Sequence, residues 1–403
     1  MIRFLTAGES HGKALTSIIE GFPSNIPLKK DYFDFHLKRR QAGYGRGGRM
    51  KIETDAVEIL SGIRFGKTLG SPISLLIKNN DWENWKEILD AEKKSSSINK
   101  VSIPRPGHAD LTGTTKYNFD DIRNSIERSS ARETAARVAV GTVARRFLEE
   151  FGITVGSYVE SIGGVYPKSN YKDKLLENLS STKKDAELLS GKADKSAVRV
   201  LDAEQEKKII NKIKLAKKKG DSLGGTFVVT ATGLPAGLGS FMHYDRRIDA
   251  DIASSIISIN AVKGVEIGNG FVSAGSFGSQ VHDEIIIKDE NFSRKTNRAG
   301  GVEGGITTGM PVIVTAAMKP IATLSNPLKT INLSNMKKTI ARHERSDFVA
   351  VPACSVIAES MLAWVIAKHF LIKFGGDSLE ETKDNYKLYT KKSFKRIQKN
   401  FKK

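Results

Sequence analysis

The sequence predicts one large protein of mixed α and β structure, on the strength of three observations. Hydrophobic residues make up 39% of 403 residues, which is enough to bury a substantial core. Helix-like and strand-like patterns alternate along the chain. No apolar run reaches the roughly 18 residues that a membrane span needs, because charged residues interrupt the longest candidate, 356–374.

The first part of the chain predicts strand, strand, helix, strand and strand, in that order, at 2–7, 13–20, 31–41, 49–61 and 71–77. Residues 80–100 are polar and predict a surface excursion. A long helix is expected over 131–151, since Ser130 and Glu133 have capping-box spacing and Gly152 stands where a C-cap glycine belongs.

Residues 165–222 are rich in Lys, Glu, Asp and Ser, and predict a peripheral insertion with one charged helix at about 203–218. The core pattern resumes at Thr226. It predicts a helix, a strand, a polar loop and a buried helix, at 249–262, 311–317, 323–344 and 356–373. Residues 376–403 form a basic tail in which we expect no chemistry.

A short pattern occurs twice. GKTLGSPI at 66–73 and GITTGMPV at 305–312 both fit G-x-x-x-G-x-P-[IV] and precede an expected strand. An Asp-rich start also leads into a helix of small residues at 120–151 and again at 245–262. A duplicated structural unit and a chance match both explain these similarities.

The formal net charge is +19, which fits either a nucleic-acid-binding protein or an enzyme that holds a small polyanion. Aromatic residues are only 7% of the chain and are not interleaved with the basic segments, which counts against single-stranded nucleic acid. Cys354 is the only cysteine, so no intrachain disulfide can form, and the first residues lack a signal-peptide pattern. We therefore expect a soluble cytoplasmic protein with no membrane partner.

Three motifs are misleading. Gly8–Gly12 matches the serine-hydrolase pattern G-x-S-x-G, but a strand is expected where that motif needs a helix. The segment 43–48 matches the dinucleotide-binding pattern G-x-G-x-x-G, but it leads into a strand where that pattern needs a helix. The segment 61–68 resembles a phosphate-binding P-loop but lacks its first glycine. His108 and Asp110 have no further ligand cluster, so no metal is expected.

Arginines concentrate in or near glycine- and proline-rich loops, at Arg39, Arg40, Arg46, Arg49, Arg105, Arg128, Arg132 and Arg345. Two histidines, His11 and His108, lie in comparable loops. Two like charges 4 Å apart cost about 4 kcal/mol at an effective dielectric of 20, so such a cluster needs an anion. We expect the loops 40–49 and 320–345 to be mobile until that ligand binds. Ser129 and Ser130 precede the long helix and suit either a phosphate site or a plain N-cap.

Several long blocks of the sequence are similar to the chorismate synthase family. They are GESHG (8–12), RRQAGYGRGGRMKIETD (39–55), RPGHAD (105–110), RSSARETAARVAVG (128–141), SINAVKGVEIGNGF (258–271), NRAGGVEGGITTG (297–309), MKPIATL (318–324) and ERSD (344–347). They follow the family's order and span about residues 1–375, which the resemblance implies is the catalytic domain.

The resemblance implies a β-α-β sandwich with internal pseudo-duplication, assembled as a homotetramer. It implies 1,4-elimination of phosphate from 5-enolpyruvylshikimate 3-phosphate to give chorismate, the last common step toward the aromatic amino acids. The family needs reduced FMN without net redox change, and NADPH is a candidate reductant. MKPIATL has Ala322 where the family usually has proline, so this loop loses a fixed φ.

The resemblance also implies residue roles. His11 would protonate the departing phosphate, with Ser10 as a helper, His108 would contact the flavin, and Asp347 would assist proton removal. The substrate's phosphate and carboxylates would be held by Arg40, Arg46, Arg49, Arg105, Arg132 and Arg345. The flavin would contact Arg128, Ser129, Ser130, Asn260, Ala261, Gly304, Lys319, Pro320, Ile321, Ala322, Thr323 and Arg345.

Three competing functions remain open on the residues. They are nucleic-acid binding, which the arginine–glycine segment 43–49 would serve, a flavin-dependent redox enzyme acting on another anion, and a serine hydrolase using Ser10. Salt-sensitive nucleic-acid binding would favour the first and net NADPH consumption the second. A fully active Ser10→Ala variant would exclude the third.

Overall fold

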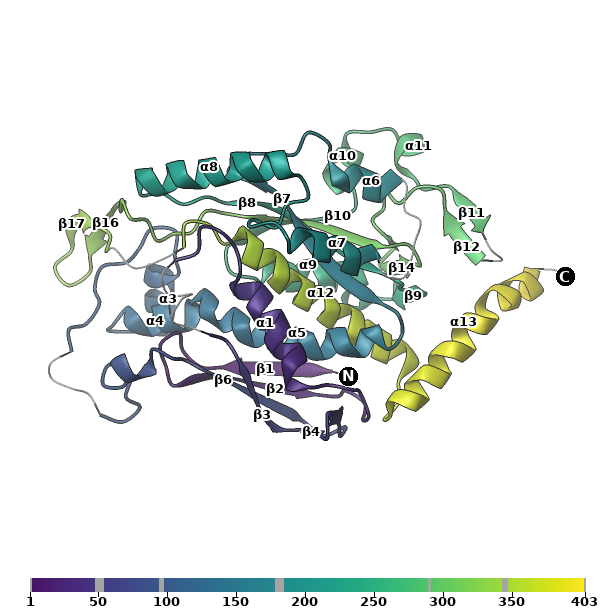
Figure 1. The fold of residues 1–403 in the computed structure, drawn as a ribbon, viewed down its shortest axis with the longest axis horizontal. Coiled ribbons are helices and arrows are strands. Elements are labelled where there is room, and N and C mark those ends of the chain that lie inside the picture. The colour runs from purple at the N-terminus through teal and green to yellow at the C-terminus, as the bar shows by residue number, and fades with distance from the viewer. Residues whose placement is uncertain are drawn as a thin grey trace.

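Two four-stranded antiparallel sheets enclose a layer of helices in the computed structural model, which describes residues 2–47, 54–93, 98–177, 185–288, 291–342 and 347–401 (Figure 1). The first sheet has the order β1 (Arg3–Ala7), β2 (Ala14–Glu20), β6 (Ile73–Lys78), β3 (Val57–Ser61). The second has the order β7 (Thr154–Ile162), β8 (Gly225–Thr232), β15 (Val312–Met318), β10 (Val262–Ile267). The mixed α and β fold and its sandwich architecture are as the sequence predicts.

The helices between the sheets carry the core. Helix α5 (Thr134–Glu149) packs on the first sheet, α12 (Val351–Phe374) packs on the second, and the two pack against each other. Helices α1 (Lys30–Gln41) and α9 (Ile248–Ile257) also pack on α12. The α5–α12 crossing is close because a Cβ built on Gly141 would lie 2.4 Å from that of Ser360.

Despite the charged residues that interrupt it, helix α12 is long and apolar enough to cross a membrane by length and composition, which differs from the expectation above. Nearly all of its side chains are buried against protein, however, including Trp364 and Phe370. A helix that is apolar on all sides is expected at the centre of a core.

The two sheets share one topology, as the implied pseudo-duplication predicts. Replacing β1, β2, β6 and β3 by β7, β8, β15 and β10 converts one strand order into the other. The repeated glycine pattern has one structure in both halves: hairpin β4 (Ile63–Arg64)–β5 (Lys67–Thr68) precedes β6, and hairpin β13 (Val302–Glu303)–β14 (Ile306–Thr308) precedes β15. Both hairpins turn on two left-handed residues, Phe65–Gly66 (φ 50° and 72°) and Gly304–Gly305 (φ 58° and 82°).

The helices do not correspond as the sequence predicts. Helix α5 matches α12, because each packs across its own sheet after the hairpin-linked strand. The segment 245–262 contains α9, which lies between β8 and β10 just as α1 lies between β2 and β3. The expected pairing of 120–151 with 245–262 is therefore wrong.

Three local expectations also differ from the structure. Residues 131–133 form a 3-10 turn, η2 (Ala131–Glu133), in which Ser130 caps the N–H of Arg132 while Glu133 pairs with Arg137, so the reciprocal capping box is absent. Within 49–61 only β3 is a strand, and 48–53 lie outside the described residues. The polar segment 323–344 contains a hairpin, β16 (Lys329–Asn332)–β17 (Lys337–Ile340).

The charged segment 165–222 contributes more to the core than its composition predicts. It forms α6 (Tyr171–Glu177), α7 (Asp185–Ala193) and α8 (Ala203–Lys219). Helix α7 packs on β7, and α8 buries Ile209 and Ile213. Arg199 donates to the buried carboxylate of Glu359 at the centre of α12. A charged outer face therefore conceals an apolar inner stripe.

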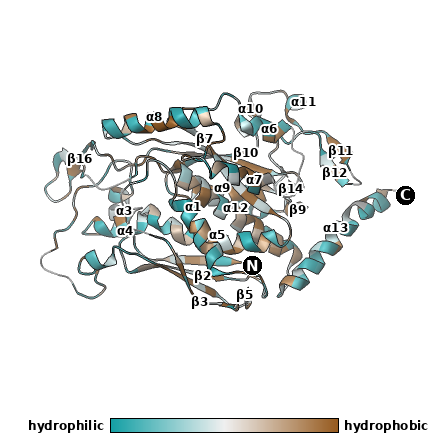
Figure 2. Ribbon diagram, viewed as in Figure 1, coloured by the Kyte–Doolittle hydropathy of each residue, from teal (hydrophilic) through white to brown (hydrophobic). Residues whose placement is uncertain are grey.

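Helix α13 (Leu379–Phe401) contacts the end of α12 and then projects from the body, and its surface is largely hydrophilic (Figures 1 and 2). The remaining elements are η1 (Trp82–Asn84), α3 (Asp110–Tyr117), α4 (Arg123–Ser129), β9 (Ala236–Gly239), η3 (Tyr244–Arg246), α10 (Gly270–Ala274), α11 (Gly278–Val281), β11 (Ile285–Lys288) and β12 (Asn291–Arg294).

Candidate active site

Four segments that are far apart in the sequence are hydrogen-bonded together at one end of the sandwich. The backbone N–H of Ser10, in the β1–β2 loop, donates to the carbonyl of Glu127 in α4 over 3.0 Å. Asn260, just before β10, donates to the carbonyl of Ser129 over 3.0 Å. The backbone of Lys319, just after β15, donates to Ala261 over 2.9 Å. These contacts join segments that belong to or adjoin four of the eight sequence blocks quoted above.

His11 lies in the β1–β2 loop, against a buried carboxylate. Its backbone N–H lies 2.8 Å from Glu127 Oε2, and its Nδ1 lies 3.0 and 3.1 Å from the two carboxylate oxygens. Burial raises the pKa of Glu127, but the hydrogen bonds and charge of His11 outweigh it, and the pKa is lowered overall. The loop joins strand to strand and Ser10 is buried, so the serine-hydrolase geometry is not formed.

His108 lies in the loop 105–110, where Asp110 is the central acceptor. Nδ1 of His108 lies 2.6 Å from Asp110 Oδ1, while Arg105 donates to the same carboxylate. Arg105 also donates to Thr323 Oγ1 over 3.0 Å, and Lys319 donates to the carbonyl of Gly107. The histidine loop is therefore attached to the segment that follows β15.

Arg40 and Arg132 face each other across Asp55. Both guanidinium groups donate to this carboxylate. The side chain of Asp55 is fully buried, and the side chains of Arg40 and Arg132 are nearly so. Arg132 also donates to Asn79 Oδ1 over 2.8 Å, and the Asn79 amide donates to the carbonyls of Glu9 and Gly12. Asn79 thereby connects the arginine pair to the loop of His11.

The remaining predicted substrate residues are only partly described. Arg46 pairs with Asp347 over 3.2 Å, and Asp347 also accepts the backbone N–H of Gly47 over 2.6 Å. Arg49 and Arg345 lie outside the described residues. Arg39 is directed away from this region and donates to Glu359 over 2.7 and 2.9 Å.

The expectation that only a bound anion could neutralise the arginine cluster is wrong. The protein supplies Asp55 to Arg40 and Arg132, Asp110 to Arg105, and Asp347 to Arg46. Because Asp55 carries one charge against two arginines, that unit keeps one net positive charge. Burial lowers the pKa of Arg40 to about 10, with Arg132 acting in the same direction and Asp55 opposing it.

The predicted cofactor residues fall into two groups. Arg128 and Asn260 line a cavity of about 390 Å³, with Phe4, Thr6, Glu133, Arg137 and Ser258, which lies within the range of about 300–1,000 Å³ for small-molecule sites. Ser129 accepts a hydrogen bond from Asn260 of this lining, and Lys319 donates to the carbonyl of Ala261, the residue after Asn260. Ser129 donates to the carbonyl of Ser125 and Ser130 is a plain N-cap. Ala261 has φ 66°, a left-handed conformation that is strained for a non-glycine residue.

Gly304 lies apart from this group. It is in the turn before β15, whereas Lys319 follows the end of β15. A strand of seven residues spans about 23 Å, and Figure 1 shows the β14 hairpin away from α3 and α4. Within one chain the structure does not bring Gly304 to the other predicted cofactor residues.

The expected mobility of 40–49 and 320–345 stays a prediction. Hairpin β16–β17 within the second segment is attached to the loop that carries His108, because Thr330 donates to the carbonyl of Pro104 and Leu333 to that of Ser102, both over 2.9 Å. Parts of both segments, 48–49 and 343–345, lie outside the described residues.

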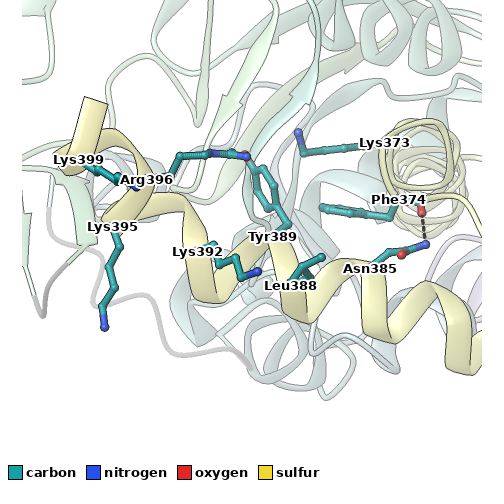
Figure 3. Close-up of a pocket in the computed structure, with 9 residues that line it drawn as sticks. All are labelled: Lys373, Phe374, Asn385, Leu388, Tyr389, Lys392, Lys395, Arg396 and Lys399. Carbon is teal, nitrogen blue, oxygen red and sulfur yellow. Dashed lines mark hydrogen bonds between the residues drawn. The ribbon is translucent and has the colours of Figure 1, made fainter. Parts of the chain in front are cut away.

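A larger pocket of about 730 Å³ lies elsewhere, between the end of α12 and α13 (Figure 3). Its lining includes five cationic side chains, among them Lys373, whose ammonium lies 4.1 Å from the ring centroid of Tyr389. No histidine or carboxylate lines it. It therefore contains neither of the two predicted catalytic histidines, and we do not assign it to the reaction.

Sequence reasoning missed the carboxylates that organise the site, and Trp85, which stacks on His11 with 4.0 Å between ring centroids. Asp55 and Asp110 end two of the sequence blocks quoted above, and Glu127 immediately precedes a third, so a charge count across these blocks could have found them. Trp85 gave no signal. Across the described ranges, no cluster of three or more His, Cys, Asp or Glu residues could hold a metal ion.

Comparison with known proteins gives one consistent result. A family model described as chorismate synthase matches residues 2–371. The chain is 53% identical over 396 residues to a chorismate synthase of Chloroherpeton thalassium, covering 97% of this chain and 100% of the relative. It is 53% identical over 392 residues to one of Aquifex aeolicus, covering 96% and 97%. A crystal structure of chorismate synthase superposes with a TM-score of 0.76 at 45% identity, covering 96% and 97%.

Proposed function

The chain belongs to the chorismate synthase family of carbon–oxygen lyases, and we propose that its reaction takes place where His11, His108 and the Arg40–Asp55–Arg132 unit meet. The reaction is the 1,4-elimination of phosphate from 5-enolpyruvylshikimate 3-phosphate, which gives chorismate for aromatic amino acid biosynthesis. The observation that carries the assignment of the site is the hydrogen-bonded link from Arg132 through Asn79 to the loop of His11.

We propose that His11 is the general acid. A phosphate leaving group is stabilised by a proton or by cations as negative charge develops on it. Nδ1 of His11 is held by Glu127, so Nε2 is the nitrogen that would donate the proton. The net positive charge of the Arg40–Asp55–Arg132 unit, with Arg46 and Arg105 nearby in the same group of loops, suits the substrate's phosphate and carboxylates. Arg49 and Arg345 are proposed to complete this set.

Reduced FMN is the proposed cofactor, and its chemistry is to lend electron density as the allylic C–O bond breaks. The residues present fit an anionic ring system, because Arg128 and Arg137 line the cavity beside Asn260 against a single carboxylate, Glu133, which pairs with Arg137. Lys319 to Thr323 and the Ser129–Ser130 pair would border it. His108 would hydrogen-bond the flavin, and Asp347 would assist removal of the ring proton of the substrate.

The finer parts of the proposal concern the assembly. We propose a homotetramer in the cytoplasm, with residues 1–375 as the catalytic unit and 376–403 as an accessory tail. NADPH is the proposed source of electrons for the flavin. Since Gly304 lies at the far end of β15 from Lys319, it would reach a flavin only in a neighbouring copy of the chain.

The test is an anaerobic incubation of the protein with dithionite-reduced FMN and 5-enolpyruvylshikimate 3-phosphate. We expect phosphate and chorismate in equal amounts, with no net oxidation of the flavin. Product formation that consumes one reducing equivalent per turnover would contradict an elimination without net redox change. If no phosphate were released, the assignment of 5-enolpyruvylshikimate 3-phosphate as the substrate would be wrong.

A further inference from the structure

Three side chains outside the predicted site hold the imidazole of His11: Glu127 and Trp85 contact it, and Arg123 contacts both of them. Glu127 and Arg123 come from α4, and Trp85 comes from the turn after η1. Trp85 falls in the segment 80–100, which the sequence predicts to be a surface excursion. These contacts explain how a histidine in a short glycine-flanked loop is held in one orientation.

Glu127 determines which ring nitrogen of His11 carries a proton. An ionised carboxylate only accepts hydrogen bonds, so Nδ1 at 3.0 Å must be the donor. The side chain of Glu127 is only 2% exposed, and its lowered pKa keeps it ionised near neutral pH. The same carboxylate accepts the backbone N–H of His11, which fixes the loop as well as the ring.

Trp85 fixes the plane of the ring. Its indole stacks on His11 at an interplanar angle of 29°, and its Nε1 donates to Asp81 over 3.0 Å. The guanidinium of Arg123 lies 4.9 Å from the centroid of the Trp85 ring and donates to Glu127 over 3.4 Å. Arg123 thus connects the stacking residue to the carboxylate.

These contacts leave one edge of the imidazole available. Within the described ranges, Nε2 of His11 has no hydrogen-bond partner, whereas Nδ1 has two acceptor oxygens. We propose that Glu127 is a positioning residue that dedicates Nε2 of His11 to the leaving phosphate, with Trp85 holding the ring plane. The proposal rests on the proposed acid role of His11.

The proton balance is simple. As the C–O bond breaks, its electron pair leaves with the phosphate, and the proton on Nε2 moves to a phosphate oxygen. The imidazolium becomes a neutral imidazole that still donates from Nδ1 to Glu127. Glu127 itself remains ionised throughout and never receives the proton.

A double-mutant cycle tests this on the full chain, with Glu127→Gln, His11→Asn and the double variant assayed under anaerobic conditions with reduced FMN. We expect Glu127→Gln to lower kcat by about 10-fold or more with KM little changed. In the His11→Asn background the same change should have no further effect, because its action passes through the imidazole. An equal loss in both backgrounds, or a wild-type kcat for Glu127→Gln alone, would overturn the proposal.

Control variants separate the possible failures. Glu150→Gln also removes a partly buried, ion-paired carboxylate, which bonds Arg146 and Lys383 but not a histidine, and should leave kcat unchanged. A second test is needed if Glu127→Gln does not fold. Trp85→Ala should then lower kcat about three- to tenfold, and Trp85→Phe should restore it. Equal kcat values for the two Trp85 variants would overturn the role of Trp85. A wild-type kcat for His11→Asn would instead reject the acid role within the proposed function.

Discussion

The carboxylate of Asp110 accepts three hydrogen bonds from Arg105, one from its backbone N–H and two from its guanidinium group, at 2.8 to 3.0 Å. The same carboxylate accepts Nδ1 of His108. Burial raises the pKa of Asp110, but the hydrogen bonds from His108 and Arg105 outweigh it and hold the pKa well below its usual range. One buried acid therefore orients both the histidine and the arginine of this loop.

Asp110→Asn should destabilise the protein by about 3 kcal/mol, because it leaves the buried charge of Arg105 without its partner. Unfolding in urea measures the change. Asp245→Asn is a matched control, since Asp245 bonds His243 at the same sequence spacing but both side chains are more than half exposed. It should cost less than about 1 kcal/mol. Equal losses in the two variants would show that burial of Asp110 is not what matters.

His11→Ala and His108→Ala should keep the fold and the binding of FMN but lose most turnover. A positioned acid contributes about 10²- to 10⁴-fold to the rate, and neither side chain is part of the hydrophobic core. Turnover, FMN titration and circular dichroism check the three expectations. His282→Ala, an exposed histidine outside the site, should behave as wild type. Full turnover in both variants would remove these residues from the mechanism.

The sequence predicts the core of this fold well because its signals are local. The two glycine patterns at 66–73 and 305–312 specify left-handed turns, and those turns form equivalent hairpins before β6 and β15. The predicted end of the long helix is marked in the structure by Gly152, which has φ 71°.

Tertiary partners were less predictable. Asp55 and Arg132 are 77 positions apart, and His11 and Glu127 are 116 apart, so no local pattern pairs them. Arg39 adjoins Arg40 in the chain, yet successive positions on a helix point in different directions. One arginine therefore bonds Glu359 and the other Asp55.

Gly141→Ala should destabilise the protein by about 1–3 kcal/mol or more, because the added Cβ would meet the backbone and Cβ of Ser360 at 2.4 to 2.6 Å. Gly191→Ala is the matched helical control. No atom lies within 4 Å of a Cβ built there, and this change should stabilise the protein by up to about 1 kcal/mol. Denaturant midpoints of the two variants should therefore move in opposite directions. A neutral Gly141→Ala would mean that α5 and α12 can separate at little cost.

Cys354 should resist thiol reagents in the native protein. It is buried in α12, and burial raises the pKa of its thiol to about 12. Because the thiolate is the reactive form, labelling at about pH 8 should be very slow until the protein unfolds. Titration with a disulfide reagent should give one thiol per chain in urea and close to none without it. Rapid labelling of the native protein would show that α12 opens to solvent.

His36 should make the protein less stable as the pH falls below neutrality. It lies on the buried side of α1, close to the Glu359 network, and its pKa is held well below its usual value. Burial is the largest cause, the charges of Arg145 and Arg39 act in the same direction, and Glu359 opposes them. In the unfolded chain a histidine titrates near pH 6.5. Below that pH the unfolded state binds a proton that the folded state does not, so the free energy of unfolding falls by up to about 1.4 kcal/mol per pH unit.

The variant His36→Asn isolates this contribution. Asparagine can still accept from Arg39, which lies 3.3 Å from Nδ1 of His36, but it cannot titrate. Urea unfolding between about pH 7 and about pH 5 should show a shallower pH dependence than wild type, even where the variant is less stable overall. His369, whose pKa is also lowered by burial, remains in both proteins, so only the difference in slope is diagnostic. The exposed His243→Asn should keep the wild-type slope, and parallel curves for His36→Asn and wild type would contradict the assignment.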